Sequence, residues 1–471
     1  MINLFILLGA YFVSFTDKPT NTSVALSPRA QEQRTQWNIP TDDLDYPVCS
    51  AYVDSISRMG ATLCHTTRWF NGATFTMSDS LAIQVTMLPF VKRVEMTRNN
   101  YSSQYSIAKR LRERSEESSI LTKNNSYVTD DQLRLYNLLP LLEAGYSGQG
   151  IVMAVCDGGF YNANTLSCFR QSELELGHFD FTDDIDDFYG STGTHGTACL
   201  STISGLTETY RGAATMAQYY LMRSEENDTE SPKEMDNIVA ALEKADSLGV
   251  NVFSASLGYA EFDNSTWTLP YSALDGKTTR ASRAAHIAAR KGMLVCIAAG
   301  NEGNSNWHMI GVPADADSIL AVGAVTEGGM IAGFSSYGPS ADGRIKPEVC
   351  AMGVQTHLIY PDGMEKCSNG TSFATPLIAG LAASLWSALP GENAMQIRER
   401  IIRSADRHTE PDIDQYGYGI PNAWAAYTMD LLSTQAPANQ EHIGSQKILR
   451  NGRILILRNG QVYDMTGNRI E

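Results

Sequence analysis

Asp157, His195, Asn301 and Ser372 are the residues whose types and spacing could do chemistry together. Ser372 stands just before the apolar helical pattern Leu377 to Leu389. The backbone N–H groups at a helix start have no helical partners, and the helix dipole favours negative charge there. Attack by a hydroxyl on a carbonyl creates an oxyanion beside the nucleophile, so this setting suits a nucleophilic serine. Taken alone, Ser372 would be more typical of a helix cap.

The neighbours of Ser372 favour its interpretation as a nucleophile. Gly370 would let a substrate come close to the backbone. Pro376 is expected in the first helical turn, where a residue without an N–H is tolerated.

The other three residues stand where strands and helices are expected to begin or end. Asp157 follows the apolar run Ile151 to Cys156, where a carboxylate could hold an imidazole. His195 opens a helical stretch of small residues, which would let its ring reach a neighbouring element. Asn301 follows the run Met293 to Ala299, and its amide could donate to an oxyanion. Each alone is more typical of a turn or a structural role; their combination is far more specific.

The motifs around these residues resemble those of the subtilisin-like (subtilase) serine protease family. They read CDGGF at Asp157, GTHGTACLSTISG at His195, AAGNEGN at Asn301 and NGTSFATPLIAG at Ser372, with SASLG at residues 254–258. The chain order Asp, His, Ser is that of subtilisin. The resemblance covers about residues 130 to 430. It implies an α/β fold, in which a mostly parallel sheet is flanked by helices in three layers, and continuous apolar runs favour the same sheet.

The resemblance also implies a role for each residue. Ser372 would be the nucleophile of a serine endopeptidase and form an acyl-enzyme, with His195 as its general base. Asp157 would hold the imidazole, and Asn301 would donate to the oxyanion. Polypeptide substrates would bind along a second set of residues, namely Ser256, Leu257, Gly258 and Gly300. This chemistry requires no metal or other cofactor.

Two alternatives remain at this point. A sedolisin-like carboxyl protease would have the same fold, but it needs a Glu in the base position and an Asp in the oxyanion position. The chain has His195 and Asn301 there. A non-catalytic surface binding protein could also retain the scaffold, although the intact catalytic motifs argue against this.

The composition excludes several classes of protein. The chain has 471 residues, 52 acidic and 36 basic, and a net charge of −16. Such a chain is a poor candidate for binding nucleic acid or an anionic membrane surface, and no run reaches the length of a membrane span. We expect a monomer. None of the eight cysteines forms a CxxC, which argues against a zinc site, while Cys350 and Cys367 flank a short loop and could be bridged.

The N-terminal part divides into three segments. Residues 1–10 are apolar and resemble the centre of an export signal; alternatively they lead into a buried strand, because Tyr11 to Phe15 alternate like one. Residues 11–98 form a small α+β unit that resembles the inhibitory, folding-assisting propeptide of secreted bacterial subtilases. Residues 99–129 are rich in charge and serine, as in a processing linker or a solvated helix face.

The C-terminal part follows the peptidase domain expected over residues 130–430. A polar linker, 431–446, leads to a tail, 447–471, with hairpin turns at Asn451-Gly452 and Asn459-Gly460. The tail resembles sorting domains of the bacterial type IX secretion system, although a strand pair packed on the enzyme is the alternative. These features predict a secreted or cell-surface bacterial enzyme. Calcium is possible as a stabiliser, and the run 183–187 offers oxygen ligands.

Overall fold

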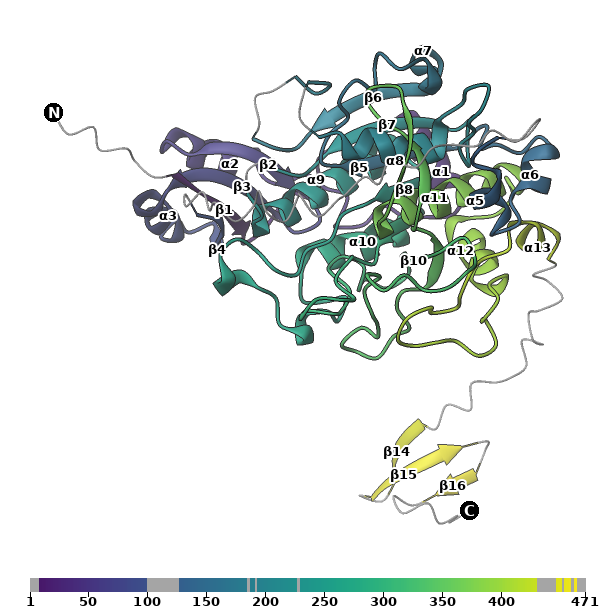
Figure 1. The fold of residues 1–471 in the computed structure, drawn as a ribbon. Coiled ribbons are helices and arrows are strands. Elements are labelled where there is room, and N and C mark those ends of the chain that lie inside the picture. Colours follow the sequence, from purple (N-terminus) through teal and green to yellow (C-terminus); the bar gives the residue numbers. More distant parts are fainter. Residues whose placement is uncertain are drawn as a thin grey trace. The chain divides into compact units, whose positions relative to one another are not determined.

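The computed structural model describes residues 8–99, 127–183, 187–190, 193–226, 229–429, 446–450, 453–458 and 461–463. The chain forms two compact units, residues 1–427 and 428–471 (Figure 1). The first unit contains an N-terminal antiparallel sheet and a large parallel sheet, and the second contains three short strands.

The N-terminal sheet has four strands in the order β2-β3-β1-β4. Its strands are β1 (Leu8–Phe15), β2 (Thr62–Thr67), β3 (Gly72–Ser78) and β4 (Val91–Arg98), and its helices are α1 (Pro28–Gln36), α2 (Ser50–Arg58) and α3 (Asp79–Thr86). Tyr11, Val13 and Phe15 alternate along β1 and form one core with Ile56 of α2 and Val85 of α3. This is the α+β unit expected from the sequence.

Strand β1 begins before the end of the leader-like segment. Leu8 lies opposite Ser78 of β3, and Ala10 pairs with both Thr76 and Arg98. Ala10 is fully buried. The last three residues of segment 1–10 therefore belong to a strand, which is the alternative interpretation of this stretch, while residues 1–7 lie outside the described part.

The large sheet has seven strands in the order β11-β10-β9-β8-β5-β7-β6, and all of its neighbours are parallel. In that order the strands are β11 (Val349–Met352), β10 (Leu320–Val325), β9 (Leu294–Ala298), β8 (Val252–Ala255), β5 (Val152–Asp157), β7 (Gln218–Arg223) and β6 (Glu175–Asp180). Strand β5 has β7 on one side and β8 on the other, although both follow it in sequence. The direction of winding therefore reverses at β5, and ligands bind at the carboxyl ends of strands beside such a point.

Helices cover both faces of the parallel sheet, giving three layers (Figure 1). Met153 and Val155 of β5 pack in one core with α8 (His195–Ser204), α11 (Thr371–Ala388) and α12 (Ala394–Arg403). Val152 and Ala154 pack on the opposite face with α9 (Pro232–Leu248) and α10 (Arg280–Arg290). Burial on both faces explains why these strands are apolar throughout.

Shorter elements complete the first unit. They are α5 (Asp130–Arg134), α6 (Leu139–Glu143), α7 (Gln171–Leu174), α13 (Ala423–Thr428) and the hairpin of β12 (Thr356–Ile359) and β13 (Glu365–Ser368). The sequence did not predict these elements or β6 and β11, because their short runs lack a clear period.

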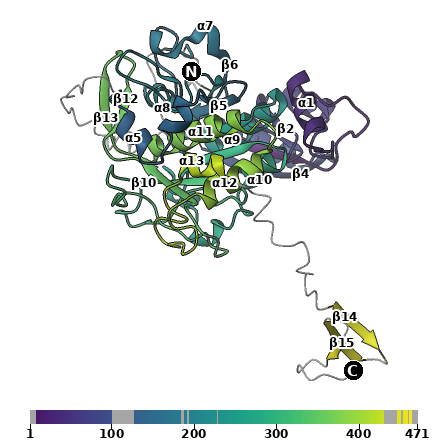
Figure 2. The ribbon, with the colours of Figure 1, turned by 90° about the vertical axis from the view of Figure 1, so that its right-hand side faces the viewer.

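The N-terminal sheet packs on helix α9, and β2 and β4 lie beside α9 in Figure 2. Helix α9 begins at Pro232, and the Glu234 carboxylate accepts a hydrogen bond from the Ser231 N–H at 3.1 Å. It ends at Leu248, and the next residue, Gly249, has a φ of 75°, the left-handed conformation that favours glycine. One face of α9 thus covers the parallel sheet, and another contacts the N-terminal domain.

The described strands of the second unit are β14 (Gln446–Arg450), β15 (Arg453–Arg458) and β16 (Gln461–Tyr463). Its strands are antiparallel, as expected for the tail. The two expected Asn-Gly turns lie outside the described residues.

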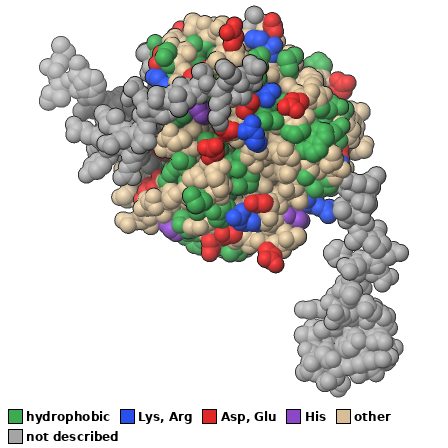
Figure 3. Space-filling model, turned by 45° about the vertical axis from the view of Figure 1, so that its right-hand side comes forward, with side chains coloured by type: hydrophobic (Ala, Val, Ile, Leu, Met, Phe, Trp, Pro, Cys, Tyr) green, Lys and Arg blue, Asp and Glu red, His purple; other side chains and the backbone are tan. Residues whose placement is uncertain are grey.

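The surface and the cysteines bear on the remaining expectations. On the face drawn in Figure 3, acidic and basic side chains are interspersed. Within the described ranges, no helix has both the length and the apolar content to cross a membrane.

All eight cysteines are free thiols, so Cys350 and Cys367 are not bridged. Cys367 Sγ lies instead 3.5 Å from Nδ1 of His357.

Candidate active site

Asp157 is the last residue of β5 and is almost completely buried. Its Oδ1 accepts a hydrogen bond from the Gly158 N–H at 2.8 Å. The same oxygen lies 2.7 Å from Nδ1 of His195. The carboxylate is therefore fixed at the end of a buried strand and holds one nitrogen of the imidazole.

His195 is the first residue of α8, and Gly196 explains how the helix comes so close to β5. A Cβ on Gly196 would lie 2.4 Å from the Gly159 carbonyl oxygen and 2.9 Å from Cβ of Asp157. Only glycine fits there. The His195 side chain keeps 18% of its surface exposed, whereas Asp157 keeps 1%. The ring thus has a buried partner on one side and access to solvent.

Ser372 is the second residue of α11, within its first turn. Its N–H belongs to the group at a helix start that precedes the first intrahelical acceptor. The ring of the next residue, Phe373, lies 5.5 Å from the His195 ring between centroids. The Ser372 hydroxyl lies 3.5 Å from the Ser256 carbonyl oxygen. The start of α11, which carries Ser372, therefore lies beside α8, and Phe373 is its side chain against the His195 ring.

Pro376 does not lie in the first turn of this helix, as the sequence suggested. Helix α11 begins at Thr371, so Pro376 is an interior residue. The expectation was wrong because the apolar pattern from Leu377 onward marks the buried face and not the first helical residue.

Asn301 follows β9 and is held by the residue before the nucleophile. Its Oδ1 accepts hydrogen bonds from the Thr371 N–H at 2.9 Å and the Thr371 hydroxyl at 3.0 Å. Because the oxygen accepts both bonds, the side-chain NH₂ is the donor left for a ligand. Gly300 has a φ of 111°, and a Cβ there would meet Ser336 Oγ at 2.8 Å. Glycine is therefore required at this turn.

Ser256, Leu257 and Gly258 follow β8, which ends at Ala255. Ser256 and Leu257 are buried, while Gly258 is exposed. Strands β5, β8 and β9 are neighbours in the sheet. Their carboxyl ends therefore place Asp157, this segment and Asn301 along one edge.

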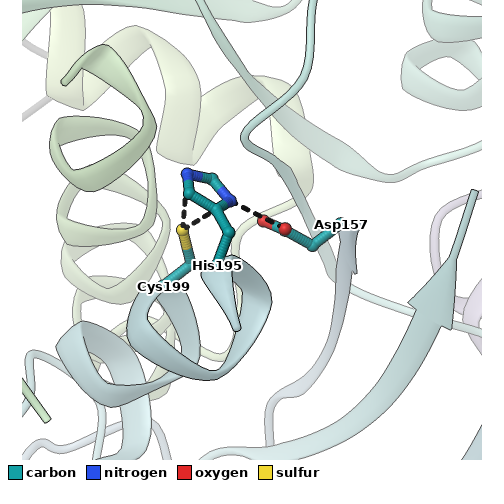
Figure 4. A group of neighbouring side chains, drawn as sticks. All are labelled: Asp157, His195 and Cys199. Carbon is teal, nitrogen blue, oxygen red and sulfur yellow. Dashed lines mark hydrogen bonds and ion pairs between the residues drawn. The ribbon is translucent and has the colours of Figure 1, made fainter. Parts of the chain in front are cut away.

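Cys199 is the residue of this site that sequence reasoning did not single out. Figure 4 shows its thiol and the Asp157 carboxylate on different sides of the His195 ring. Cys199 Sγ lies 3.8 Å from Nδ1 and 3.9 Å from Nε2. Because these distances are nearly equal, the sulfur is in line with neither nitrogen lone pair, so it packs against the ring. Its position four residues after His195 on a helix was the available signal.

The Cys199 thiol is not a competing nucleophile. Burial raises its pKa to about 11, although the nearby imidazole of His195 acts in the opposite direction. The thiolate is the nucleophilic form of cysteine, so this side chain is inert at neutral pH. Asp157, His195 and Cys199 form the one group of possible metal ligands found among the described residues. The sulfur of Cys199 is in line with neither nitrogen lone pair of His195, which argues against a metal ion bound between these three side chains.

Comparison with known proteins decides the family. Residues 148–419 match the model described as the subtilase family, and residues 10–115 match that of the Peptidase S8 propeptide domain of Bacteroidota. The chain belongs to the subtilase family. Subtilases are serine endopeptidases, so this chain is a hydrolase of that class, and it carries an N-terminal propeptide domain.

Individual relatives agree with this assignment. Subtilisin DY of Bacillus licheniformis is 31% identical over 302 residues, which cover 61% of this chain and 97% of the relative. Subtilisin E of Bacillus subtilis (strain 168) is 30% identical over 285 residues, covering 60% and 67%. Among solved structures, MycP1 from the ESX-1 type VII secretion system matches with a TM-score of 0.52 at 20% identity, covering 68% of this chain and 92% of that chain. The last match shows the fold, a subtilisin-like α/β fold.

Proposed function

We propose that this subtilase cleaves peptide bonds with Ser372 as nucleophile, His195 as general base and Asp157 as its partner. Ser372 Oγ attacks the scissile carbonyl while Nε2 of His195 takes its proton. The imidazole then gives that proton to the leaving amine, and water releases the acyl group by the same route. The observation that carries this proposal is the 2.7 Å contact between Asp157 Oδ1 and Nδ1 of His195, which orients the imidazole and stabilises its protonated form.

Two donors would stabilise the oxyanion. They are the side-chain NH₂ of Asn301 and the backbone N–H of Ser372, which lies at the positive end of α11. The support for Asn301 is its orientation, because Thr371 engages the amide oxygen twice. Asn301 is hydrogen-bonded to Thr371, the residue before Ser372. The Asn301 NH₂ and the Ser372 N–H therefore keep a fixed spacing.

Substrates would bind as an added strand along the segment after β8. Gly258 is exposed and has no side chain, which allows a peptide backbone to approach. Gly300 would border the pocket for the side chain before the cleaved bond. Its N–H donates to Thr371 Oγ1 at 3.3 Å, so this edge of the pocket is hydrogen-bonded to the residue before Ser372.

The enzyme would be exported and made as an inactive precursor. The match to a propeptide domain and the packing of the N-terminal sheet on α9 support this. Self-cleavage would fall within residues 99–129, and the tail would direct sorting at the bacterial surface. Calcium would act only as a stabiliser. Of the acidic run, Asp183 forms ion pairs with Arg98 and Lys233, and residues 184–186 lie outside the described part.

Labelling with a fluorophosphonate probe tests the proposal. The wild-type chain and Ser372→Ala are incubated to permit self-processing, then labelled and separated by size. We expect a labelled, shortened wild-type band, whose N-terminal sequence begins within 99–129. The Ser372→Ala chain should stay full length and unlabelled.

Three results would contradict the proposal. A folded wild type that never labels, at any pH and with calcium present, would favour the non-catalytic binding protein. Equal labelling of both chains would place the nucleophile elsewhere. Activity that persists in Ser372→Ala but is lost in Asp157→Asn would favour carboxyl chemistry instead.

A further inference from the structure

The carbonyl group of Ser372 lacks its usual helical partner. In an α-helix each C=O accepts a bond from the N–H four residues later. For Ser372 that residue is Pro376, which has no N–H and lies inside α11. The proline ring also crowds the carbonyl four residues before it, so this carbonyl is expected to tilt away from the helix axis.

Two side chains donate to this carbonyl from neighbouring elements. Ser256 Oγ lies 2.7 Å from the Ser372 oxygen, and Cys199 Sγ lies 3.4 Å from it. A hydroxyl is a strong donor and a thiol a weak one, so Ser256 provides most of the replacement. Ser256 also contacts Ser372 a second time, because its carbonyl oxygen accepts a hydrogen bond from the Ser372 hydroxyl at 3.5 Å.

We propose that the Ser256 hydroxyl positions the nucleophile by replacing the hydrogen bond that Pro376 removes from the Ser372 carbonyl. This inference rests on the proposed role of Ser372. Ser256 belongs to the segment proposed to bind substrate. Its hydrogen bond to the Ser372 carbonyl would therefore fix the position of the nucleophile relative to the bound peptide backbone. Ser256 acts through Ser372 and is a positioning residue.

The expected consequence is a loss of turnover with little loss of binding. Ser256→Ala keeps the backbone that would pair with a peptide, so KM should change by less than about threefold. A misplacement of about 1 Å can cost a factor of about 100, so we expect kcat to fall about 10- to 100-fold. The pH at which kcat is half maximal should not move, because the Asp157–His195 contact is untouched.

A double-mutant cycle provides the sharpest test. Pro376→Ala supplies an N–H to the Ser372 carbonyl. Because the Ser256 hydroxyl already donates to this carbonyl, the single variant should change kcat little. In the double variant Ser256→Ala/Pro376→Ala, this N–H should restore at least half of the logarithmic loss in kcat. Full-length chains are incubated for self-processing, and kcat, KM and the rate of fluorophosphonate labelling are measured on the processed band.

Ser384→Ala is the matched control. Ser384 is also buried on α11, and its hydroxyl donates to the Ala213 carbonyl at 2.6 Å, away from the catalytic residues. Its loss should lower the thermal midpoint without lowering kcat. If Ser256→Ala does not fold, Ser256→Thr, which keeps the hydroxyl, and Ser256→Cys, which weakens it, should give graded values of kcat.

The outcomes separate this inference from the proposed function. Wild type that labels normally, together with a Ser256→Ala variant of unchanged kcat, would overturn the positioning role alone. So would a folded double variant that recovers no activity. A wild type that never labels would remove both proposals.

Discussion

At the scale of single residues, the orientation of Asn301 is the feature with the clearest consequence. Amide oxygen and nitrogen are distinguished only by their hydrogen bonds. Here the Thr371 N–H and hydroxyl both donate to Asn301, so its acceptor end must face Thr371. The NH₂ group is therefore fixed before a substrate arrives, which is what oxyanion stabilisation requires.

We predict that Asn301→Leu lowers kcat by about 100- to 1000-fold, because one oxyanion donor is lost. KM should change little, since this donor acts mainly on the transition state. Thr371→Val is the companion variant. It removes one of the two bonds that hold the amide and should lower kcat less. Steady-state kinetics on a peptide substrate would measure both, and an unchanged kcat in Asn301→Leu would contradict the assignment.

At the scale of elements, helix α9 and the N-terminal domain are joined by buried ion pairs. Arg34 of α1 lies 2.9 Å from Asp246 of α9 and 2.7 Å from Asp45. Arg68, in the turn after β2, lies 2.5 Å from Asp246. The Asp246 side chain keeps only 3% of its surface exposed. A carboxylate so far from water is stable there only while its cationic partners remain.

We predict that Asp246→Asn destabilises the chain by about 3 to 5 kcal/mol, because it leaves two buried cations without their shared partner. The measurement is denaturant unfolding in the Ser372→Ala background, where self-processing cannot interfere. Arg93→Gln is the control. Arg93 pairs with Glu95 but is 72% exposed, so its loss should cost under about 1 kcal/mol. Similar losses in both variants would refute the distinction between buried and exposed pairs.

At the scale of the whole molecule, the N-terminal and peptidase domains form one compact unit, and a histidine lies where they meet. His65 is on β2, near Asp236, Lys233 and Asp183 of the peptidase domain. Burial lowers its pKa to about 4; Lys233 acts in the same direction, whereas the two aspartates act against it. Its ordinary value is near 6.5. His65 is therefore neutral in the folded precursor.

We predict that the precursor loses stability as the pH falls from about 6.5 to about 4. In that window the unfolded chain binds a proton at His65 and the folded chain does not, so stability rises with pH. The contribution is complete above about pH 6.5 and amounts to at most about 3 kcal/mol. Thermal unfolding of Ser372→Ala against pH would measure it. His65→Gln should flatten the slope in this window, and an identical slope would remove His65 as the cause.

Local patterns predicted most of the secondary structure that carries the site. The strand ending at Asp157 and the helix opening at His195 lie where the sequence places them. A continuous apolar run marks the strand, and a stretch of small residues beside glycine marks the helix. The motifs also identified the family. The start of α11 was misplaced relative to Pro376, because a buried helix is apolar on all sides and its pattern does not mark its first residue.

The sequence by itself determined the family, the parallel sheet and the order of the polar residues proposed to do the chemistry. Only the tertiary structure decided which groups those residues touch. Ser256 donates to a carbonyl 116 positions away, and Arg34 meets a carboxylate 212 positions away. Periodicity reports which face of an element is buried but not which distant side chain meets it. Such contacts arise only when elements far apart in the chain pack together.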